Sequence, residues 1–319
     1  MEKKPLIILA GPTATGKTSL SIQLAKMLDA EIISADSMQV YKGMDIGTAK
    51  VCSEEMQGIK HHLIDILSPN ETFHVAAFKE RSKLALNNIH KNGKLPVVVG
   101  GTGFYIQALL YDIDFHEESE NKEYRKALEN LAVKKGNLCL HDMLKEIDEK
   151  AAAEIHPNNR KRIIRALEYF QENNAPISLH NEEQRKKASP YQFAYFVLND
   201  DRNQIYAHIN ERVDNMIEKG LVSEVEGLLK QGYQKELVSM QGLGYKEIID
   251  YLDGNVTLAD AIYMIKRDTR HFAKRQLTWF QREKDVIWVN QNELKDSNDI
   301  LPFITNHLKE RGIIRNDTK

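Results

Sequence analysis

The segment Gly11-Pro12-Thr13-Ala14-Thr15-Gly16-Lys17-Thr18 has the spacing of a phosphate-binding loop, a glycine and four residues followed by Gly-Lys-Thr. Its glycines allow a tight turn whose backbone N–H groups point at an anion, and the lysine ammonium can reach phosphate oxygens. The Thr18 hydroxyl suits Mg²⁺, so we predict Mg²⁺ as cofactor with Thr18 as its protein ligand. The pattern predicts a di- or triphosphate site without deciding between a nucleotide and another diphosphate ester.

The elements around this loop are those that its chemistry requires. Residues 6–10 form a continuous apolar run, which predicts a strand buried on both faces of a parallel sheet. Residues 17–28 have helical spacing, so a strand enters the loop and a helix leaves it. The helix would therefore begin at the phosphates.

Asp36 is the candidate general base, because it directly follows a second predicted strand, residues 31–35. Ligands of open α/β sheets bind at the carboxyl ends of the strands, which places this carboxylate beside the phosphate loop. An aspartate at a strand end can also cap a turn or bind Mg²⁺ through water. The residues alone leave these alternatives open.

The order of elements predicts an α/β fold of the P-loop NTPase type, a mostly parallel sheet flanked by helices. Further strands are expected at residues 96–99, 194–198 and 286–289, with a short one at 63–67. From about residue 112 to 189 the spacing is helical and no strand is evident. We therefore predict an α/β core of residues 1–112 and 190–319 with C-terminal helices, and an all-helical insertion domain of residues 113–189.

Composition narrows the function classes. The 319 residues include 44 basic and 46 acidic side chains, a net charge of −2, which argues against coating nucleic acid by bulk charge but allows local basic faces. Two distant cysteines, Cys52 and Cys139, give neither a disulfide framework nor a paired-cysteine zinc site. No apolar stretch approaches the roughly 18 residues of a membrane span. We expect a cytoplasmic monomer with no membrane or protein partner.

Two segments could form basic faces. Residues 160–165 hold four cations in six positions, a run that is usually only a solvated helix face. Around residue 270, helical spacing places Arg267, Arg270, His271, Lys274, Arg275 and Arg282 within an arc of roughly 140°. Ile265, Phe272, Trp279 and Phe280 lie opposite, so this helix is predicted to have one core face and one phosphate-tracking face.

The adjacent pair His61-His62 does not predict a metal site. Neighbouring residues of a strand point to opposite faces, so the two rings are poor ligands for one ion. We expect both histidines to be structural.

A long and distinctive block, residues 34–50, closely resembles the tRNA dimethylallyltransferases when it is taken with the phosphate loop. Other blocks spread over residues 11 to about 281 share the resemblance. They are His61-His62-Leu63-Ile64-Asp65, Val99-Gly100-Gly101-Thr102-Gly103-Phe104-Tyr105, His156-Pro157-Asn158, Arg165-Ala166-Leu167-Glu168, Gln241-Gly242-Leu243-Gly244-Tyr245-Lys246 and Lys274-Arg275-Gln276-Leu277-Thr278-Trp279-Phe280.

The resemblance implies transfer of a dimethylallyl group from dimethylallyl diphosphate to N6 of the adenine on the 3′ side of the anticodon in tRNA, with release of diphosphate. It implies that Asp36 accepts the N6 proton and that Arg212 reaches the diphosphate. It also places Thr102 near the reacting groups, although a threonine in such a turn could instead cap the next helix. Without further cysteines for a zinc finger, the chain resembles the bacterial type.

The resemblance also implies a set of positions that contact the anticodon stem-loop of tRNA, whose target adenine must leave the stack to reach Asp36. The helix pattern favours packing for Trp279, which belongs to this set. The predicted positions are Asp36, Ser37, Met38, Gln39, Arg125, Lys161, Arg162, Ile163, Ile164, Arg165, Gln241, Gly242, Leu243, Gly244, Tyr245, Lys246, Lys274, Arg275, Gln276 and Trp279.

Three rival functions remain to be weighed against this one. A phosphate-loop kinase would use the same loop and Asp36, but residues 34–50 and the basic C-terminal helix argue against it. An adenylate isopentenyltransferase would prenylate a free nucleotide, whereas the basic segments favour tRNA. A non-enzymatic RNA-binding protein would not need a phosphate loop opposite a carboxylate. Whether ATP occupies the loop is left open.

Overall fold

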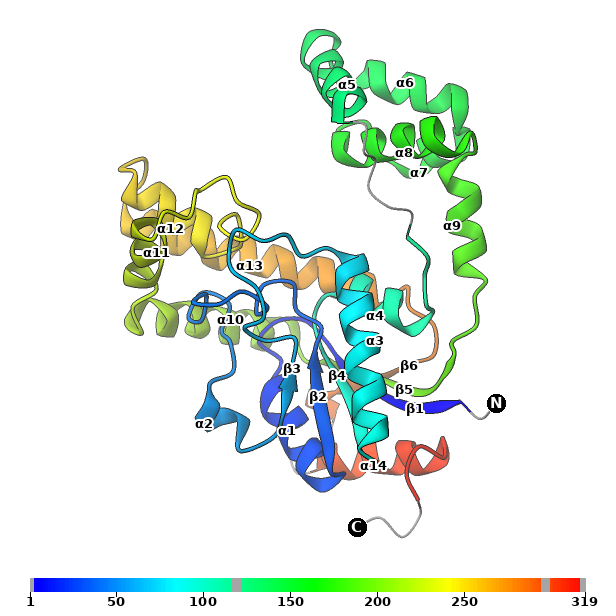
Figure 1. Ribbon diagram of the computed structural model, residues 1–319. Coiled ribbons are helices and arrows are strands. Elements are labelled where there is room, and N and C mark those ends of the chain that lie inside the picture. The colour runs from blue at the N-terminus through cyan, green and yellow to red at the C-terminus, as the bar shows by residue number, and fades with distance from the viewer. Residues whose placement is uncertain (1–2, 116–121, 294–298, 316–319) are drawn as a thin grey trace. The chain divides into compact units, whose positions relative to one another are not determined.

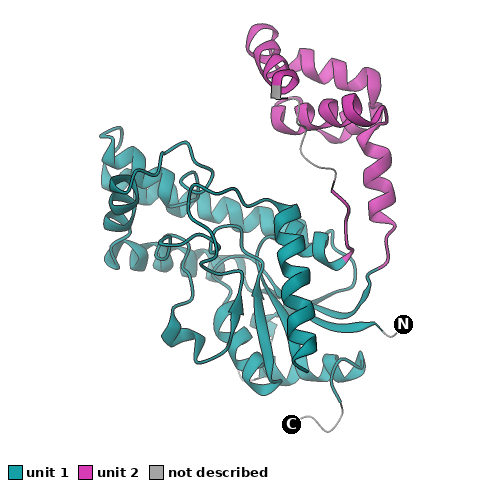
Figure 2. Ribbon diagram, in the orientation of Figure 1, with its two compact units in different colours: residues 1–110, 189–319 teal, residues 111–188 magenta. Residues whose placement is uncertain are grey.

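The computed structural model describes residues 3–115, 122–293 and 299–315. The chain divides into two compact units, Met1–Leu110 with Ser189–Lys319 and Tyr111–Ala188 (Figure 2). The boundaries expected from sequence follow residues 112 and 189, and those in the structure follow residues 110 and 188.

The larger unit is built on one six-stranded sheet in which every pair is parallel (Figure 1). This confirms the predicted α/β fold class. The strand order is β3-β2-β4-β1-β5-β6. The bounds are β1 Lys4–Ala10, β2 Ala30–Ser34, β3 His61–His62, β4 Leu95–Gly100, β5 Tyr191–Asn199 and β6 Val286–Asn290.

The expectation of a strand at residues 63–67 is wrong, and the third strand is the His61–His62 pair just before it. Leu63 and Asp65 have φ angles of 65° and 54°, which end the extended conformation. Leu67 forms only an isolated bridge to Tyr41.

Helices cover both faces of the sheet. On one face α1 (Lys17–Met27) and α14 (Ile300–Glu310) share a buried cluster with Ile7 and Leu9. Side chains alternate along a strand, so the neighbouring residues of β1 face the opposite side. There α3 (Val75–Lys91) packs against β2 and β4, and α4 (Gly103–Leu110) packs against α3 (Figure 1).

The C-terminal helices bring distant residues to the carboxyl edge of the sheet. The 23-residue helix α13 (Leu258–Phe280) packs on α10 (Arg202–Glu218), α12 (Tyr245–Leu252) and α4. Helix α11 (Leu221–Lys230) packs on α10 and α12, and the short α2 (Ser53–Met56) and the 3-10 turn Gln291–Glu293 complete this unit's helices within the described residues.

In its described residues the smaller unit is helical, with its own core. Its helices are α5 (Lys122–Lys135), α6 (Asn137–Ile147), α7 (Glu149–Glu154), α8 (Arg160–Asn173) and α9 (Ile177–Arg185). Leu140 and Leu144 of α6 pack with Ile163 and Leu167 of α8. Across both units, no described helix combines the length and apolar character that a membrane crossing needs.

Candidate active site

The phosphate loop, residues 11–18, joins β1 to α1 and has the backbone geometry that its glycines predict. Gly11 has a φ of 149°, and a Cβ there would lie 2.6 Å from the Leu198 carbonyl oxygen. Gly16 is the left-handed N-cap of α1, with a φ of 76°. The Lys17 ammonium donates to the Pro12 carbonyl at 2.6 Å, and the Thr15 hydroxyl donates to the same oxygen at 2.9 Å. The Lys17 side chain therefore bonds back to the backbone of its own loop and helps to close it.

Three of the predicted residues, Lys17, Asp36 and Arg212, form one charged cluster. Arg212 lies on α10 and donates from Nη1 to the Thr13 hydroxyl at 3.2 Å. Burial, and secondly the Arg212 guanidinium, lower the pKa of Lys17 to about 7, opposed by the attraction of the Asp36 carboxylate. Burial also lowers the pKa of Arg212, again opposed by Asp36. A bound diphosphate would offset the repulsion between the Lys17 and Arg212 cations, so the cluster is suited to this ligand.

Asp36 lies two residues beyond β2, at the carboxyl edge of the sheet. Its Oδ1 accepts hydrogen bonds from the backbone N–H groups of Met38 at 2.8 Å and Gln39 at 3.2 Å. This is the turn-capping role that the sequence left open, and it leaves Oδ2 available. One carboxylate can therefore hold its own turn and still accept a proton.

Thr102 lies in the glycine turn between β4 and α4, against the end of β2. Its N–H donates to the Ala35 carbonyl at 3.3 Å, and a Cβ on Gly100 would overlap the Ala35 backbone. The Thr102 carbonyl accepts the first N–H groups of α4, from Tyr105 and Ile106. Its hydroxyl has no hydrogen bond within the described residues, so it does not cap α4.

A cleft of about 510 Å³ opens beside the phosphate loop. It is lined by Ala14 and Gly16 of the loop, by Arg212 and neighbouring residues of α10, and by parts of the segment 45–55. This volume is in the range of small-ligand sites.

The donors present fit Mg²⁺ bound mainly through a ligand's phosphates. The described residues contain no group of three or more His, Cys, Asp or Glu able to hold a metal alone. Thr18 is exposed at the start of α1, and Mg²⁺ retains waters and phosphate oxygens around a few protein ligands. His61 is bonded to the Ile59 carbonyl at 2.9 Å and His62 to Glu31 at 2.7 Å, consistent with structural histidines.

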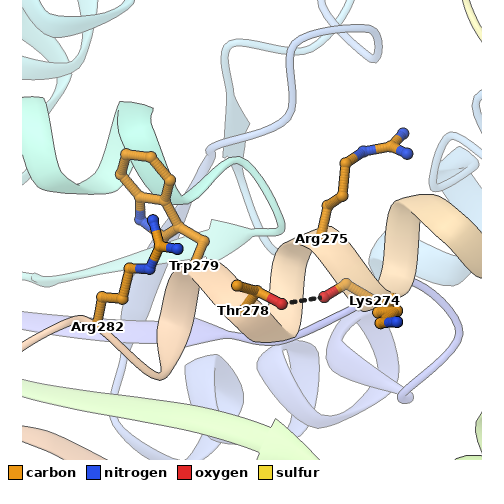
Figure 3. Close-up of a pocket in the computed structure, with 5 residues that line it drawn as sticks. All are labelled: Lys274, Arg275, Thr278, Trp279 and Arg282. Carbon is orange, nitrogen blue, oxygen red and sulfur yellow. Dashed lines mark hydrogen bonds between the residues drawn. The ribbon is translucent and has the colours of Figure 1, made fainter. Parts of the chain in front are cut away.

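Helix α13 connects this site to a basic surface. Lys274, Arg275 and Arg282 line a cavity of about 210 Å³ with Thr278 and Trp279 (Figure 3). Two cations of the predicted basic arc already have partners within the protein. Arg267 pairs with Asp268 at 2.7 Å, and Arg270 donates to Asn210 at 2.7 Å.

Comparison with known proteins now decides the family. A family model described as IPP transferase matches residues 39–283. The chain belongs to the IPP transferase family. A curated relative from Lachnoclostridium phytofermentans named tRNA dimethylallyltransferase is 57% identical over 312 residues, which cover 98% of this chain and 100% of the relative.

Solved structures of IPP transferases have the same fold. The full-length tRNA isopentenylpyrophosphate transferase from Bacillus halodurans matches with a TM-score of 0.73 and 44% identity, covering 98% of each chain. A eukaryotic dimethylallyltransferase described as acting on tRNA matches with a TM-score of 0.83 and 28% identity, covering 99% of this chain and 82% of that one.

Two of the segments that resemble tRNA-contacting motifs of the IPP transferases lie side by side. A Cβ on Gly242 would lie 2.5 Å from the Met38 methyl carbon, so residues 37–39 contact the turn 241–246. Ser37, Met38, Gln39, Gly242 and Leu243 are half-buried, Gln241 is exposed and the Lys246 side chain is 41% exposed. The Gly244 N–H donates to the Glu247 carboxylate at 2.8 Å, which fixes the turn at the start of α12.

Several residues predicted to contact tRNA make contacts within the protein. Ile163 and Ile164 are 0% and 3% exposed in the core of the smaller unit, and Tyr245 is 0% exposed. These three side chains therefore pack within the protein, and the tRNA contacts of their segments stay predictions. Arg125 forms two 2.8 Å bonds to Glu168, a buried carboxylate. On α8, Lys161 and Arg162 are exposed and Arg165 is half-buried, so these remain predicted contacts.

Two further residues of the predicted set, Gln276 and Trp279, pack against neighbouring segments. Gln276 is buried and bonds to Thr13 and Gly101 at 3.0 Å each, so its side chain points away from the exposed cations of α13. The Trp279 ring fills the space beside Gly103 and meets Phe104 edge-on at 5.9 Å. The ring thus packs as the helix pattern predicts and also lines the cavity beside the basic side chains, so its predicted tRNA contact stays a prediction.

Sequence reasoning missed Glu224 of α11. Its carboxylate accepts the N–H groups of Asp45, Ile46 and Gly47 at 2.9, 2.7 and 3.1 Å, and the Tyr245 hydroxyl donates to it at 2.7 Å. Glu224 thus holds the end of the block 34–50 against the turn 241–246. A lone glutamate on an amphipathic helix carries no motif that could have identified it.

Proposed function

We propose that this chain is a tRNA dimethylallyltransferase. It transfers a dimethylallyl group from dimethylallyl diphosphate to N6 of the adenine on the 3′ side of the anticodon and releases diphosphate. The main support for this proposal is that Lys17 and Arg212 lie with the Asp36 carboxylate at one edge of the sheet, in a chain that belongs to the IPP transferase family. Two cations face a leaving diphosphate, and a carboxylate faces the amine.

Asp36 acts as the general base in this proposal. The exocyclic amine of adenine is a weak nucleophile, because its lone pair is delocalised into the ring. As N6 forms its bond to C1 of the dimethylallyl group, the C1–O bond to diphosphate breaks and the N6 proton passes to Asp36. Oδ2 can take that proton while Oδ1 keeps its bonds to Met38 and Gln39. A positioned base of this kind accelerates proton transfer by about 10²–10⁴-fold.

The phosphate loop and Arg212 stabilise the departing diphosphate. Backbone N–H groups at the start of α1, the Lys17 ammonium and the Arg212 guanidinium supply positive charge where negative charge develops. Mg²⁺, held through Thr18, would add charge neutralisation at the diphosphate when bound. Thr102, whose N–H bonds to the carbonyl of Ala35 next to Asp36, would lie on the acceptor side of the site.

The tRNA anticodon stem-loop is the proposed macromolecular partner. Exposed cations of α13 and α8 would contact its phosphates, and the paired segments 37–39 and 241–246 would contact the anticodon loop near Asp36. We propose a monomer without a protein partner, acting in the cytoplasm, where tRNA is found.

The test uses purified protein, Mg²⁺ and labelled dimethylallyl diphosphate with unmodified tRNA, AMP or ATP as separate acceptors. Mass spectrometry of the digested product locates the label. We expect label on the adenine beside the anticodon and none on free nucleotide. Label on the nucleotide would instead identify an adenylate prenyltransferase, and ATP consumption without prenyl transfer would identify a kinase.

A further inference from the structure

Gln276 joins three elements that the reaction needs. It lies on α13, is 7% exposed, and uses both ends of its carboxamide. Oε1 accepts the Thr13 N–H of the phosphate loop at 3.0 Å, and Nε2 donates to the Gly101 carbonyl of the glycine turn at 3.0 Å. One side chain therefore ties the diphosphate side of the site to the turn that carries Thr102.

We infer that Gln276 is a positioning residue that sets the separation between the diphosphate and the acceptor adenine. The inference rests on the proposed prenyl transfer. Thr13, whose N–H Gln276 holds, also accepts the hydrogen bond from Arg212. Gly101, whose carbonyl Gln276 holds, is followed by Thr102, whose N–H bonds to the residue before Asp36. Gln276 is thus linked to Arg212 through Thr13, and to the residue before Asp36 through Gly101 and Thr102.

A carboxamide is required at this position. The two bonds need an acceptor and a donor on one terminal carbon, which an ionised carboxylate or an apolar side chain of similar length cannot supply. The carboxamide lies directly against the turn, because even a Cβ on Gly101 would overlap Nε2. The loss of either bond would leave a backbone group without its partner.

The position of Gln276 on α13 also connects the phosphate loop to the helix predicted to bind RNA. Lys274 and Arg275, on the exposed face of α13 (Figure 3), immediately precede Gln276 in sequence. A tRNA that docks on these cations contacts the helix that holds the phosphate loop. Gln276 itself points inward, so its substitution should change turnover rather than tRNA affinity.

The test compares Gln276→Met and Gln276→Glu with Gln281→Met, a matched change at an exposed position after the same helix. With saturating tRNA and dimethylallyl diphosphate at pH 8, we expect about 100-fold lower kcat in both Gln276 variants, because a misplacement of about 1 Å has this effect. The tRNA Kd should stay within twofold, and Gln281→Met should match the parent.

Lowering the pH separates positioning from general damage. In Gln276→Glu, protonation of the introduced carboxyl group restores a donor on a side chain with the shape of the carboxamide. The kcat of this variant relative to the parent should therefore recover toward pH 5.5, whereas Gln276→Met should show no recovery. Parent-like kcat in both variants at every pH, or a tRNA Kd that rises as much as kcat falls, would overturn the inference.

Binding of inorganic diphosphate with Mg²⁺, measured by calorimetry, distinguishes failure of the inference from failure of the proposed function. We expect Gln276→Met to bind diphosphate about tenfold more weakly than the parent and Gln281→Met to bind it equally, since a lost backbone anchor costs about one such factor. A parent that binds diphosphate but prenylates nothing would refute the function. Equal diphosphate binding by all three proteins would refute the inference that Gln276 positions the phosphate loop.

Discussion

Replacing Asp36 with asparagine should separate the proposed base from the turn that it caps. Asparagine retains a side-chain oxygen for the N–H groups of Met38 and Gln39, but its amide cannot accept the N6 proton. We therefore expect folding stability within about 0.5 kcal/mol of the parent, as for a conservative change outside the core. The rate of prenyl transfer should fall by about 10²–10⁴-fold.

Asp36→Ala removes both functions, and the comparison gives the size of each. Two hydrogen bonds to a charged, half-buried oxygen are lost, and with each such bond worth at least about 1.5 kcal/mol we expect alanine to destabilise the fold by about 3 kcal/mol. Transfer should be abolished, while tRNA affinity stays within about threefold because Asp36 contributes no positive charge to phosphate binding.

Single-turnover transfer to unmodified tRNA, with both substrates saturating, measures the chemical step directly. Urea unfolding supplies the stability difference, and filter binding supplies the tRNA Kd. If Asp36→Asn transfers within tenfold of the parent rate, the carboxylate is not the base and its role is to hold the turn. If either variant loses tRNA binding while bound tRNA turns over normally, Asp36 is an RNA contact instead.

Lys274→Gln should reduce the slope of log Kd for tRNA against log salt by about 0.7–0.9, the contribution of one phosphate contact. Lys266→Gln is the control, because that ammonium pairs with Asp214 at 2.6 Å, and equal slopes in both variants would remove Lys274 from the interface. Glu224→Gln should destabilise the fold by about 2 kcal/mol in urea, since both carboxylate oxygens accept two hydrogen bonds each and glutamine keeps only one of these oxygens, and an unchanged midpoint would contradict this. Burial raises the pKa of Glu283 from 4.5 to about 7, so the folded state binds a proton more tightly than the unfolded state and stability falls as pH rises from about 4.5 to 7. Glu283→Gln lacks this loss, so unfolding at pH 4 and pH 8 should show its advantage over the parent growing by up to about 3 kcal/mol, and a constant difference would refute the shift.

The phosphate loop and Asp36 could be predicted because their geometry is local. Gly11 and Gly16 fix the loop by their own backbone conformations, and the buried run of β1 with the start of α1 leaves little choice of position. A residue that follows a parallel strand must lie at the carboxyl edge, so Asp36 was placed without knowing its neighbours. The charge cluster with Arg212, far later in the chain, rested on the family resemblance and not on spacing.

The internal partners of the cations could not be predicted in this way. Helical spacing groups Arg267 and Arg270 with Lys274, but it does not show that Asp268 and Asn210 already bind the first two. The same limit applies to Gln276, which lies among exposed cations in sequence. Its direction is set by contact with the phosphate loop, 263 positions away in the chain, and no local pattern records such a contact.

Side chains supply part of the hydrogen bonding that holds the loops at this sheet edge. Asp36 holds its own turn, Glu224 holds the N–H groups of residues 45–47, and Gln276 holds the phosphate loop and the glycine turn. Two of these three side chains come from α11 and α13, far along the chain from the loops that they hold. Because a buried backbone N–H or C=O needs a partner, the loops and these helices must order together. The catalytic edge is therefore a product of the C-terminal helices as much as of the strands, which explains why motifs that position one small site are spread over nearly the whole chain.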